Sequence, residues 1–357
     1  ALLRGMVGKK HAGLLPIRGH SNVQGMGSMA VTPALKTAVF DRLTAEGVSV
    51  PTMTGHDTMA CIRAAERNEM DLAFCLGGNL YGSNPNSTAT IAAFSKIETV
   101  VYASTSLNTG HAWGTGKETI ILPVLARDEE KQSTTQESMF SFVRLSDGGI
   151  NRHQNLKLEV DVISEIASRV LGNDGIFNWE EFKNHDSIRK IISKIIPGYE
   201  SIEDLSKSKE EFQIPDRILH KPIFSTESGK ANFIFHTIPN LSPLNKNEFQ
   251  LLSVRSEGQF NTVVYEDDDI YRGQDRRDVV LMNKSDMENM GFAKDECVLI
   301  KSNIGEIKNI LARPFNIKQG AVLMYYPEVN SLIGRDVDPL SQTPGFKSAL
   351  VTITAFS

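Results

Sequence analysis

The sequence of 357 residues contains little cysteine and no long apolar run. Cys61, Cys75 and Cys297 lie far apart and outside any C-x-x-C pair, which argues against a zinc or iron–sulfur site built from neighbouring thiols. Reduced structural thiols favour a cytoplasmic protein. No stretch approaches the roughly 18 apolar residues of a membrane span. The start, ALLRGMVGKK, does not begin with Met and lacks the order of a signal peptide, so we expect it to lie within a longer sequence.

Common nucleotide and nucleophile motifs are also missing. The chain has no P-loop, no G-x-G-x-x-G and no nucleophile elbow, which weakens the hypothesis of an ordinary nucleotide-dependent α/β enzyme. A formal net charge of −5 argues against a nucleic-acid-binding surface over the whole molecule, but allows a local basic pocket for phosphates. The length predicts more than one domain.

The first part of the chain alternates predicted helices and strands. Thr32 and Pro33 have the types of an N-cap and first helical residue, with Gly47 closing that helix, and a second helix is expected from Asp57 to about Asn68. Strands separated by helices predict an α/β fold with a doubly wound, mostly parallel sheet. The predicted strands are 71–79, 99–105 and 119–125, and the helix between the first two is 88–97.

A change of pattern marks the second part. Residues 158–172 carry a helical stripe, and the polar segment 199–216 predicts a solvated linker. From 217 onward short β-rich runs separated by turns predict a small closed β-barrel. We therefore expect an α/β domain at 31–198 and a barrel domain at 217–357. The predicted barrel strands are 249–254, 278–283, 296–302, 305–312, 321–326 and 349–356.

The stretch GKKHAGLLPIRGHSNVQG (8–25) is the most polar candidate loop. Arg18 has a bidentate fork suited to a carboxylate or phosphate. A surface turn is the alternative, but the position between Pro16 and Gly25, ahead of a predicted helix, favours an ordered ligand loop. The side chains that could read a polar heterocycle through paired donors and acceptors are His20, Ser21, Asn22 and Gln24.

Two further loops follow predicted strands. In CLGGNLYGSNPNS (75–87), Gly77 and Gly78 permit backbone approach to a phosphate or ribose, although such glycines also occur in plain tight turns. STSLNTGHAWGTGK (104–117) could supply ligand contacts, or His111 could simply cap its loop. The polar residues of this loop are Ser104, Asn108, His111 and Lys117. The acidic run EDDD (266–269) could suggest a metal, but a solvated run is favoured because adjacent acids point in different directions.

Five motifs in order resemble the large subunit of molybdopterin oxidoreductases, in the formate-dehydrogenase-like branch of the dimethyl sulfoxide reductase superfamily. The resemblance covers essentially the whole chain. The motifs are HAGLLPIRGHSNVQG, LGGNLYGSNPN, GKETIILPVLARDE, RSEGQFNT…YRG…RRDVVLMN and PEVNSLIG…DPLSQTPGFKS.

The resemblance implies a bis-molybdopterin guanine dinucleotide cofactor carrying molybdenum or tungsten, and a double-psi-like barrel. Arg18 matches the family arginine that orients formate, with His20 beside it as a second candidate catalytic residue. Asn22 and Gln24 match pterin and phosphate contacts. Gly77, Gly78 and Asn79 match one guanosine diphosphate loop. The barrel positions that match cofactor contacts are Arg255, Gln259, Asn261, Asn330 and Lys347.

The resemblance also implies a missing half. The family's metal-ligand cysteine or selenocysteine, and any 4Fe-4S cluster, belong to an N-terminal half, so residues 1–30 would be a loop of a domain whose remainder lies upstream. We expect the chain to be the C-terminal half of an oxidoreductase that acts on formate or a similar small acid or oxyanion, with an electron-transfer partner, and to be inactive alone. The alternative is an inactive module that carries the cofactor.

Overall fold

The computed structural model describes most of the chain, namely residues 1–14, 20, 22–138, 141–173, 176–217, 219–238 and 244–356. The chain divides into two compact units, each formed from two separate stretches. Unit 1 comprises residues 1–56 and 124–239, and unit 2 comprises 57–123 and 240–357. These units cut across the predicted domain at 31–198, because its sheet belongs to unit 2 and its later helices belong to unit 1.

Unit 1 packs helices against a small antiparallel sheet in the order β4-β5-β6. Its core contains Val39 of α2, Val143 of β5 and Ile195 of α8. The strands are β4 Thr134–Glu137, β5 Phe142–Ser146 and β6 Phe212–Gln213. The helices are α1 Val23–Ser28, α2 Thr37–Ala45, α7 Glu159–Leu171, α8 His185–Ile195 and α9 Leu205–Ser208, with 3-10 turns at Leu2–Arg4, Arg127–Glu129, Glu181–Lys183 and Glu200–Ile202.

Two predictions in unit 1 are wrong. The first helix begins at Thr37, with Lys36 as N-cap, because the Thr32 hydroxyl donates to the carbonyl of Ala34 and forms a turn. The predicted linker 199–216 is not a solvated connection. Its apolar residues recur every few positions and are buried in the core of the unit: Tyr199, Ile202, Leu205 and Ile214.

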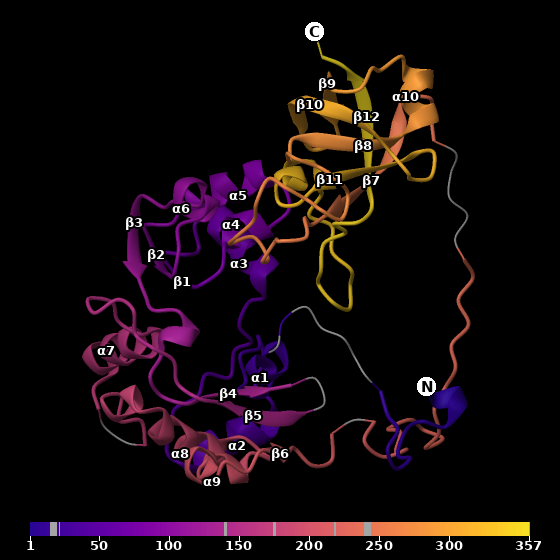
Figure 1. Ribbon diagram of the computed structural model, residues 1–357. Helices are drawn as coiled ribbons and strands as arrows, with labels where there is room; N and C mark the ends of the chain where they lie inside the picture. The colour runs from indigo at the N-terminus through magenta and orange to yellow at the C-terminus, as the bar shows by residue number, and fades with distance from the viewer. Residues whose placement is uncertain are drawn as a thin grey trace. The chain divides into compact units, whose positions relative to one another are not determined.

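The first stretch of unit 2 folds as the predicted parallel sheet, in the order β1-β2-β3 (Figure 1). The strands are β1 Leu72–Leu76, β2 Thr99–Ser104 and β3 Glu118–Pro123. The helices are α3 Thr58–Glu66, α4 Leu80–Ser83, α5 Ser87–Phe94 and α6 Thr109–Trp113. Asp57 caps α3 as its type predicts, accepting from the N–H of Ala60 at 2.8 Å.

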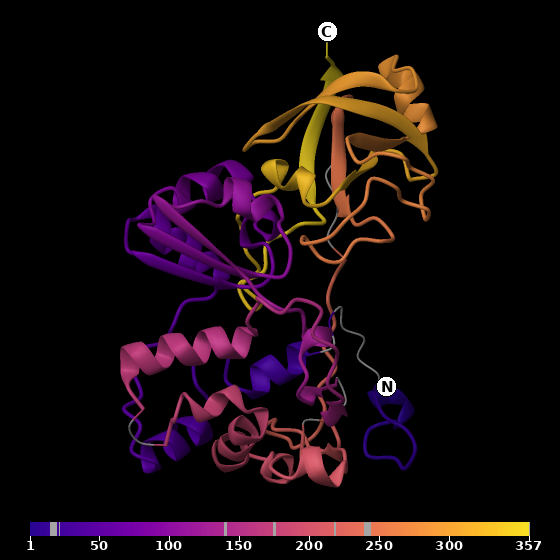
Figure 2. The ribbon, with the colours of Figure 1, turned by 60° about the vertical axis from the view of Figure 1, so that its left-hand side comes forward.

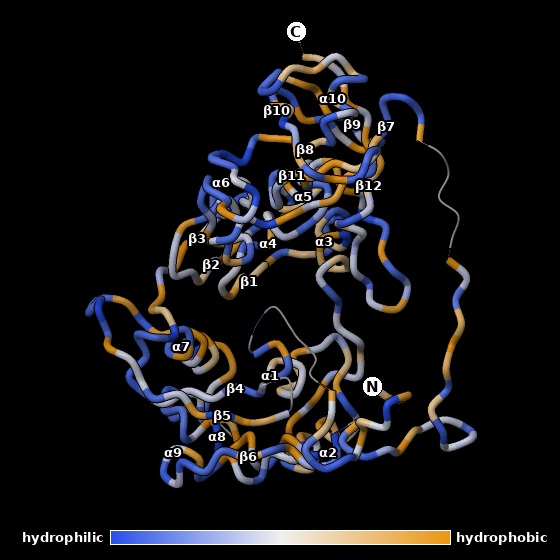
Figure 3. The backbone as a smooth tube through the Cα atoms, turned by 45° about the vertical axis from the view of Figure 1, so that its right-hand side comes forward, coloured by the Kyte–Doolittle hydropathy of each residue, from blue (hydrophilic) through white to orange (hydrophobic). Residues whose placement is uncertain are grey.

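The two faces of this sheet differ. Helices α3 and α5 cover one face (Figure 2). There Ile62 and Phe94 pack in one core cluster with Val100 and Tyr102. The register aligns Phe74, Val101 and Ile120 on the opposite face. β1 is apolar throughout (Figure 3). The exposed side chains on the second face are Leu72 at 59%, Phe74 at 40%, Leu76 at 49% and Ile120 at 40%.

The second stretch of unit 2 forms the predicted closed barrel, in the order β10-β8-β11-β7-β12-β9. Leu251, Val280, Ile300 and Ile353 fill its interior. All the predicted barrel strands are confirmed within a few residues. They are β7 Glu248–Val254, β8 Val279–Asn283, β9 Glu296–Lys301, β10 Glu306–Phe315, β11 Ala321–Tyr325 and β12 Ala349–Ala355, with helix α10 Lys284–Met290 and a 3-10 turn at Glu328–Leu332.

Candidate cofactor site

The loop after β1 is shaped by two glycines and a buried asparagine. Gly77 and Gly78 have φ values of 65° and 71°, a region that glycine enters without strain. A Cβ on Gly78 would meet open space, so its backbone lies accessible to a ligand. Asn79 caps α4, its Oδ1 accepting from the N–H of Gly82 at 2.8 Å. The loop is therefore pre-shaped before any ligand binds.

The loop after β2 is closed by a reciprocal cap. Asn108 Oδ1 accepts from the N–H of Gly110 at 2.9 Å, and His111 Nδ1 accepts from the N–H of Asn108 at 3.0 Å. Because Nδ1 accepts, Nε2 carries the proton and donates to Ser104 Oγ at 3.1 Å. His111 therefore caps its loop, and its role in cofactor binding stays a prediction.

Asn79 joins three loops of unit 2 at one point. Its Nδ2 donates to Thr109 Oγ1 at 2.8 Å and to the carbonyl of Thr262, in the loop after β7, at 2.9 Å. Asn108 Nδ2 donates to the carbonyl of Gly78 at 3.1 Å. The predicted residues of the sheet edge are therefore brought together, and they meet the barrel. No sequence motif indicated Thr109 or Thr262, because only the fold brings them next to Asn79.

The predicted residues of the barrel loop contact one another. Arg255 donates to Asn261 Oδ1 at 3.2 Å and its guanidinium lies 5.3 Å from the centre of the Tyr326 ring. Gln259 Nε2 donates to the carbonyls of Asn261 and Tyr326, both at 2.7 Å. Asn261 has a φ of 50°, a left-handed conformation that asparagine tolerates. Arg255 is exposed and its charge faces solvent.

Cations gather beside this loop. Lys347 donates to the carbonyl of Ser253. Burial, together with nearby Arg255 and Arg272, lowers the pKa of Lys347. Arg272 also donates to the carbonyl of Arg255 at 3.0 Å. Like charges held this closely favour an anion, so the cluster fits the diphosphate of a dinucleotide. Sequence reasoning missed Arg272, which stands in the YRG motif but was given no role.

Asn330 is fully buried between the barrel and the sheet segment of unit 2. Its Nδ2 donates to the carbonyl of Gly82 at 2.8 Å, and its own carbonyl accepts from the N–H of Asn86 at 2.8 Å. Within the described residues its Oδ1 has no hydrogen-bond partner. An unsatisfied buried acceptor is costly and fits a ligand that carries a donor.

Several predicted residues lie elsewhere. Lys117 precedes β3, at the opposite end of the sheet from the loops above, and pairs with Glu98 on the surface. His20, Asn22 and Gln24 belong to unit 1. Asn22 is exposed, while His20 and Gln24 are half-buried. The predictions for Arg18 and Ser21 lie outside the described residues.

The EDDD run is only partly solvated. Asp269 is 1% exposed and accepts from Tyr325 Oη and Arg272, both at 2.7 Å. Burial acts to raise the pKa of this carboxyl, but the hydrogen bonds from Arg272 and Tyr325 hold it below its ordinary value. Asp269 is therefore a structural anchor of the cation cluster. The other three residues of the run are exposed, as predicted.

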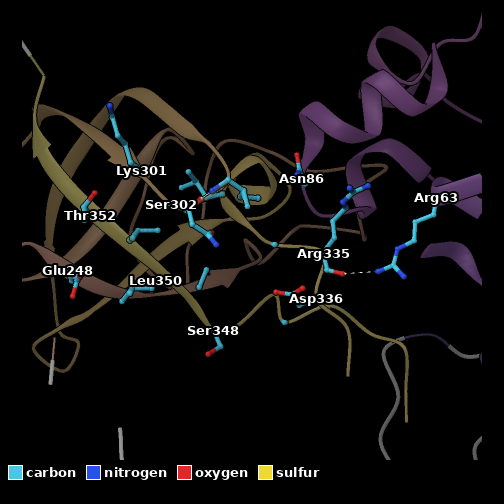
Figure 4. Close-up of a pocket in the computed structure, with 17 residues that line it drawn as sticks. Arg63, Asn86, Glu248, Lys301, Ser302, Arg335, Asp336, Ser348, Leu350 and Thr352 are labelled. Carbon is cyan, nitrogen blue, oxygen red and sulfur yellow. Dashed lines mark hydrogen bonds between the residues drawn. The ribbon is translucent and has the colours of Figure 1, made fainter. Parts of the chain in front are cut away.

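A pocket of about 950 Å³ lies elsewhere in unit 2, between the barrel and α3 (Figure 4). Arg63 points toward the carbonyl of Arg335, to which it donates at 3.5 Å. Arg335 pairs with Glu66, so much of the local charge is neutralised. Among the described residues that line this pocket, none is a predicted site residue. We therefore place the candidate site at the Asn79 junction and the cation cluster.

No group of three or more His, Cys, Asp or Glu side chains in the described part of the chain is placed to hold a metal ion. The described helices are all too short or too polar to cross a membrane.

Known proteins resemble this chain at the level of one domain and of the whole length. Residues 249–350 match the molydopterin dinucleotide binding domain. Over 99% of its length the chain is 32% identical to an uncharacterized oxidoreductase of Mycobacterium tuberculosis, 29% to protein YdeP of Escherichia coli K12 and 25% to formate dehydrogenase H of the same strain. The chain spans about half the length of these relatives, 48%, 49% and 52% respectively.

The fold agrees as well. Acetylene hydratase from Pelobacter acetylenicus superposes with a TM-score of 0.61, at 15% identity, over 85% of this chain and 47% of that one. The resemblance indicated by the motifs is therefore confirmed: residues 249–350 match the molydopterin dinucleotide binding domain, and the whole chain is similar to oxidoreductases that include formate dehydrogenase H.

Proposed function

We propose that the chain forms the C-terminal, cofactor-binding half of a formate-dehydrogenase-like molybdopterin oxidoreductase. The observation that carries this proposal is the junction at Asn79, where both sheet-edge loops and the loop after β7 meet. The matched dinucleotide-binding domain contributes that last loop, next to the cations of Arg255, Arg272 and Lys347. Preformed loops beside a cluster of three cations, of which Arg272 is paired with Asp269, suit a long, multiply charged ligand.

The residues of the junction and cluster would hold a molybdopterin guanine dinucleotide. Arg255, Arg272 and Lys347 would neutralise its phosphates, while the backbone at Gly78 approaches it closely. Asn330 Oδ1 would accept from a donor on the ligand. When bound, this cofactor supplies two-electron redox chemistry at molybdenum or tungsten, and the chain's own residues orient it and exclude water.

Residues outside unit 2, and an N-terminal half, would complete the active site. Arg18 would bind the carboxylate of formate or a similar small acid, with His20 close by. An N-terminal half would complete the metal coordination and hold any 4Fe-4S cluster, so this chain alone would be inactive. An electron-transfer partner would accept or supply the electrons. A cytoplasmic location stays a prediction.

The test measures the metal and nucleotide content of the protein that is encoded by the complete reading frame and purified without air. Molybdenum, tungsten, iron and released guanine nucleotide are measured per chain. The proposal expects about one molybdenum or tungsten and about two guanine nucleotides. Guanine without metal would instead indicate a carrier module, and the absence of both would refute cofactor binding altogether.

The role of Arg18 is tested by Arg18→Ala in the same protein. Loss of a fixed cation beside the substrate should lower turnover by about 100-fold or more, while metal and guanine contents stay near those of the unmodified protein. If both contents fall together with activity, Arg18 anchors the cofactor and does not act on the substrate.

A further inference from the structure

A buried carboxylate in unit 1 lies outside every predicted site. Glu137, the last residue of β4, is 2% exposed. Its Oε2 accepts from Ser28 Oγ at 2.5 Å and from Tyr199 Oη at 2.6 Å. Its Oε1 lies 3.3 Å from Arg217 Nη2. Three residues distant in sequence thus converge on one side chain.

Glu137 contacts both ends of α1. Ser28 is the last residue of this helix, and Asn22 is its N-cap position. The backbone N–H of Glu137 donates to Asn22 Oδ1 at 3.1 Å, while its carboxylate accepts from Ser28. α1 begins within the last residues of the polar stretch 8–25 and carries Gln24. The position of Asn22 and Gln24 is therefore coupled to one residue of β4.

Gly25 makes this close approach feasible. A Cβ at this position would lie 2.1 Å from Asn22 Oδ1 and 3.4 Å from the backbone nitrogen of Glu137. Any larger residue would displace the asparagine side chain or separate α1 from β4. The final glycine of the GHSNVQG sequence thus has a packing reason to be there.

An opposite charge and hydrogen bonds together compensate for the burial of the Glu137 carboxylate. A buried carboxylate is costly unless it is paired and hydrogen-bonded, and Arg217 supplies the opposite charge. Arg217 also donates to Ser28 Oγ at 2.9 Å. Burial, and then the hydrogen bond to Glu137, raises the pKa of Tyr199, so its hydroxyl stays a neutral donor. These bonds are directional, so they fix the placement of α1 more narrowly than apolar packing would.

We propose that Glu137 is a positioning residue for the cofactor loop. It holds α1 through Ser28 and Asn22, and so presents Asn22 and Gln24 for cofactor binding. This inference rests on the proposed function, because it assigns the presented residues to cofactor binding.

The test compares Glu137→Gln with Glu129→Gln in the protein purified from its complete reading frame. Glu129 is a matched control, since it is 7% exposed in the same unit and accepts from the N–H of Ala126 at 2.9 Å, away from α1 and α8. Hydrogen exchange is followed in α1 and in α8, and guanine is measured per chain. In Glu137→Gln we expect exchange in α1 to accelerate about tenfold, with α8 unchanged, and guanine to fall severalfold. The control should change neither.

A pair of substitutions at Ser28 distinguishes a positioning role of this contact from a general effect on stability. Ser28→Thr keeps the hydroxyl and should retain the guanine that Ser28→Ala loses. An unchanged rate of hydrogen exchange in α1 of Glu137→Gln would refute the proposal. Faster exchange in α1 with a normal guanine content would refute it as well, and so would equally faster exchange in α1 and α8. If the unmodified protein holds no guanine, the proposed function fails, while exchange confined to α1 still identifies Glu137 as the residue that positions this loop.

Discussion

The two halves of the candidate site are built on opposite principles. At the sheet edge, Asn79, Asn108 and His111 satisfy one another and their own backbones, so the loops are complete without a ligand. At the barrel, Arg255, Arg272 and Lys347 crowd like charges together. The sheet-edge half therefore keeps its geometry without a ligand, whereas a bound anion would stabilise the barrel half.

The largest effect should come from Asn79→Ala, which tests the geometric half. It removes a helix cap and two buried hydrogen bonds, so we expect a loss of about 2–4 kcal/mol in the free energy of unfolding. Denaturant unfolding measures this loss. Asn84→Ala is the control, because Asn84 is also buried but donates within its own turn to the carbonyl of Leu80. An equal loss in both variants would mean that Asn79 does not join the loops.

Arg255→Ala tests the affinity half. Retained guanine should fall about tenfold, because a charge-assisted contact to phosphate is lost, while the free energy of unfolding changes by less than about 0.5 kcal/mol. Arg276→Ala serves as control, since Arg276 is on the same barrel but pairs with Asp278. Unchanged guanine in Arg255→Ala would remove the cation cluster from the site.

The lowered pKa of Lys347 predicts a pH dependence in the cofactor-free protein. The unfolded chain holds this proton more tightly, so the free energy of unfolding should rise with pH just below the ordinary lysine value of about 10.4. Lys347→Met should flatten that rise when unfolding is measured over the alkaline range. Bound phosphates should also flatten it, by raising the pKa again. A slope unaffected by the substitution would assign the effect to other groups.

The smallest effect should come from Lys117→Ala. Lys117 and Glu98 form an exposed pair, with side chains 57% and 58% accessible, and such pairs contribute little. Stability and guanine content should both remain within error of the unmodified protein. A clear drop in guanine would return Lys117 to the site.

The sequence predicted the fold better than it predicted the site. Barrel strands such as 296–301 were found because apolar runs between turns reflect a closed core. The segment 199–216 was misjudged because its few apolar residues are diluted by charged ones, although each is buried. At the candidate site, Asn108 was predicted from its place after a strand, and Asn79 from the family resemblance. Thr262 and Glu137 were not, because their contacts span 183 and 109 residues, a separation that no local pattern encodes.

The uncovered face of the β1-β2-β3 sheet has a practical consequence for anyone who expresses this chain. Parallel sheets are normally shielded on both sides, and here Leu72, Phe74, Leu76 and Ile120 face solvent. Such a surface attracts hydrophobic dyes and other exposed chains. The isolated polypeptide should therefore self-associate as its concentration rises, and buffers that weaken apolar contacts should keep it dispersed.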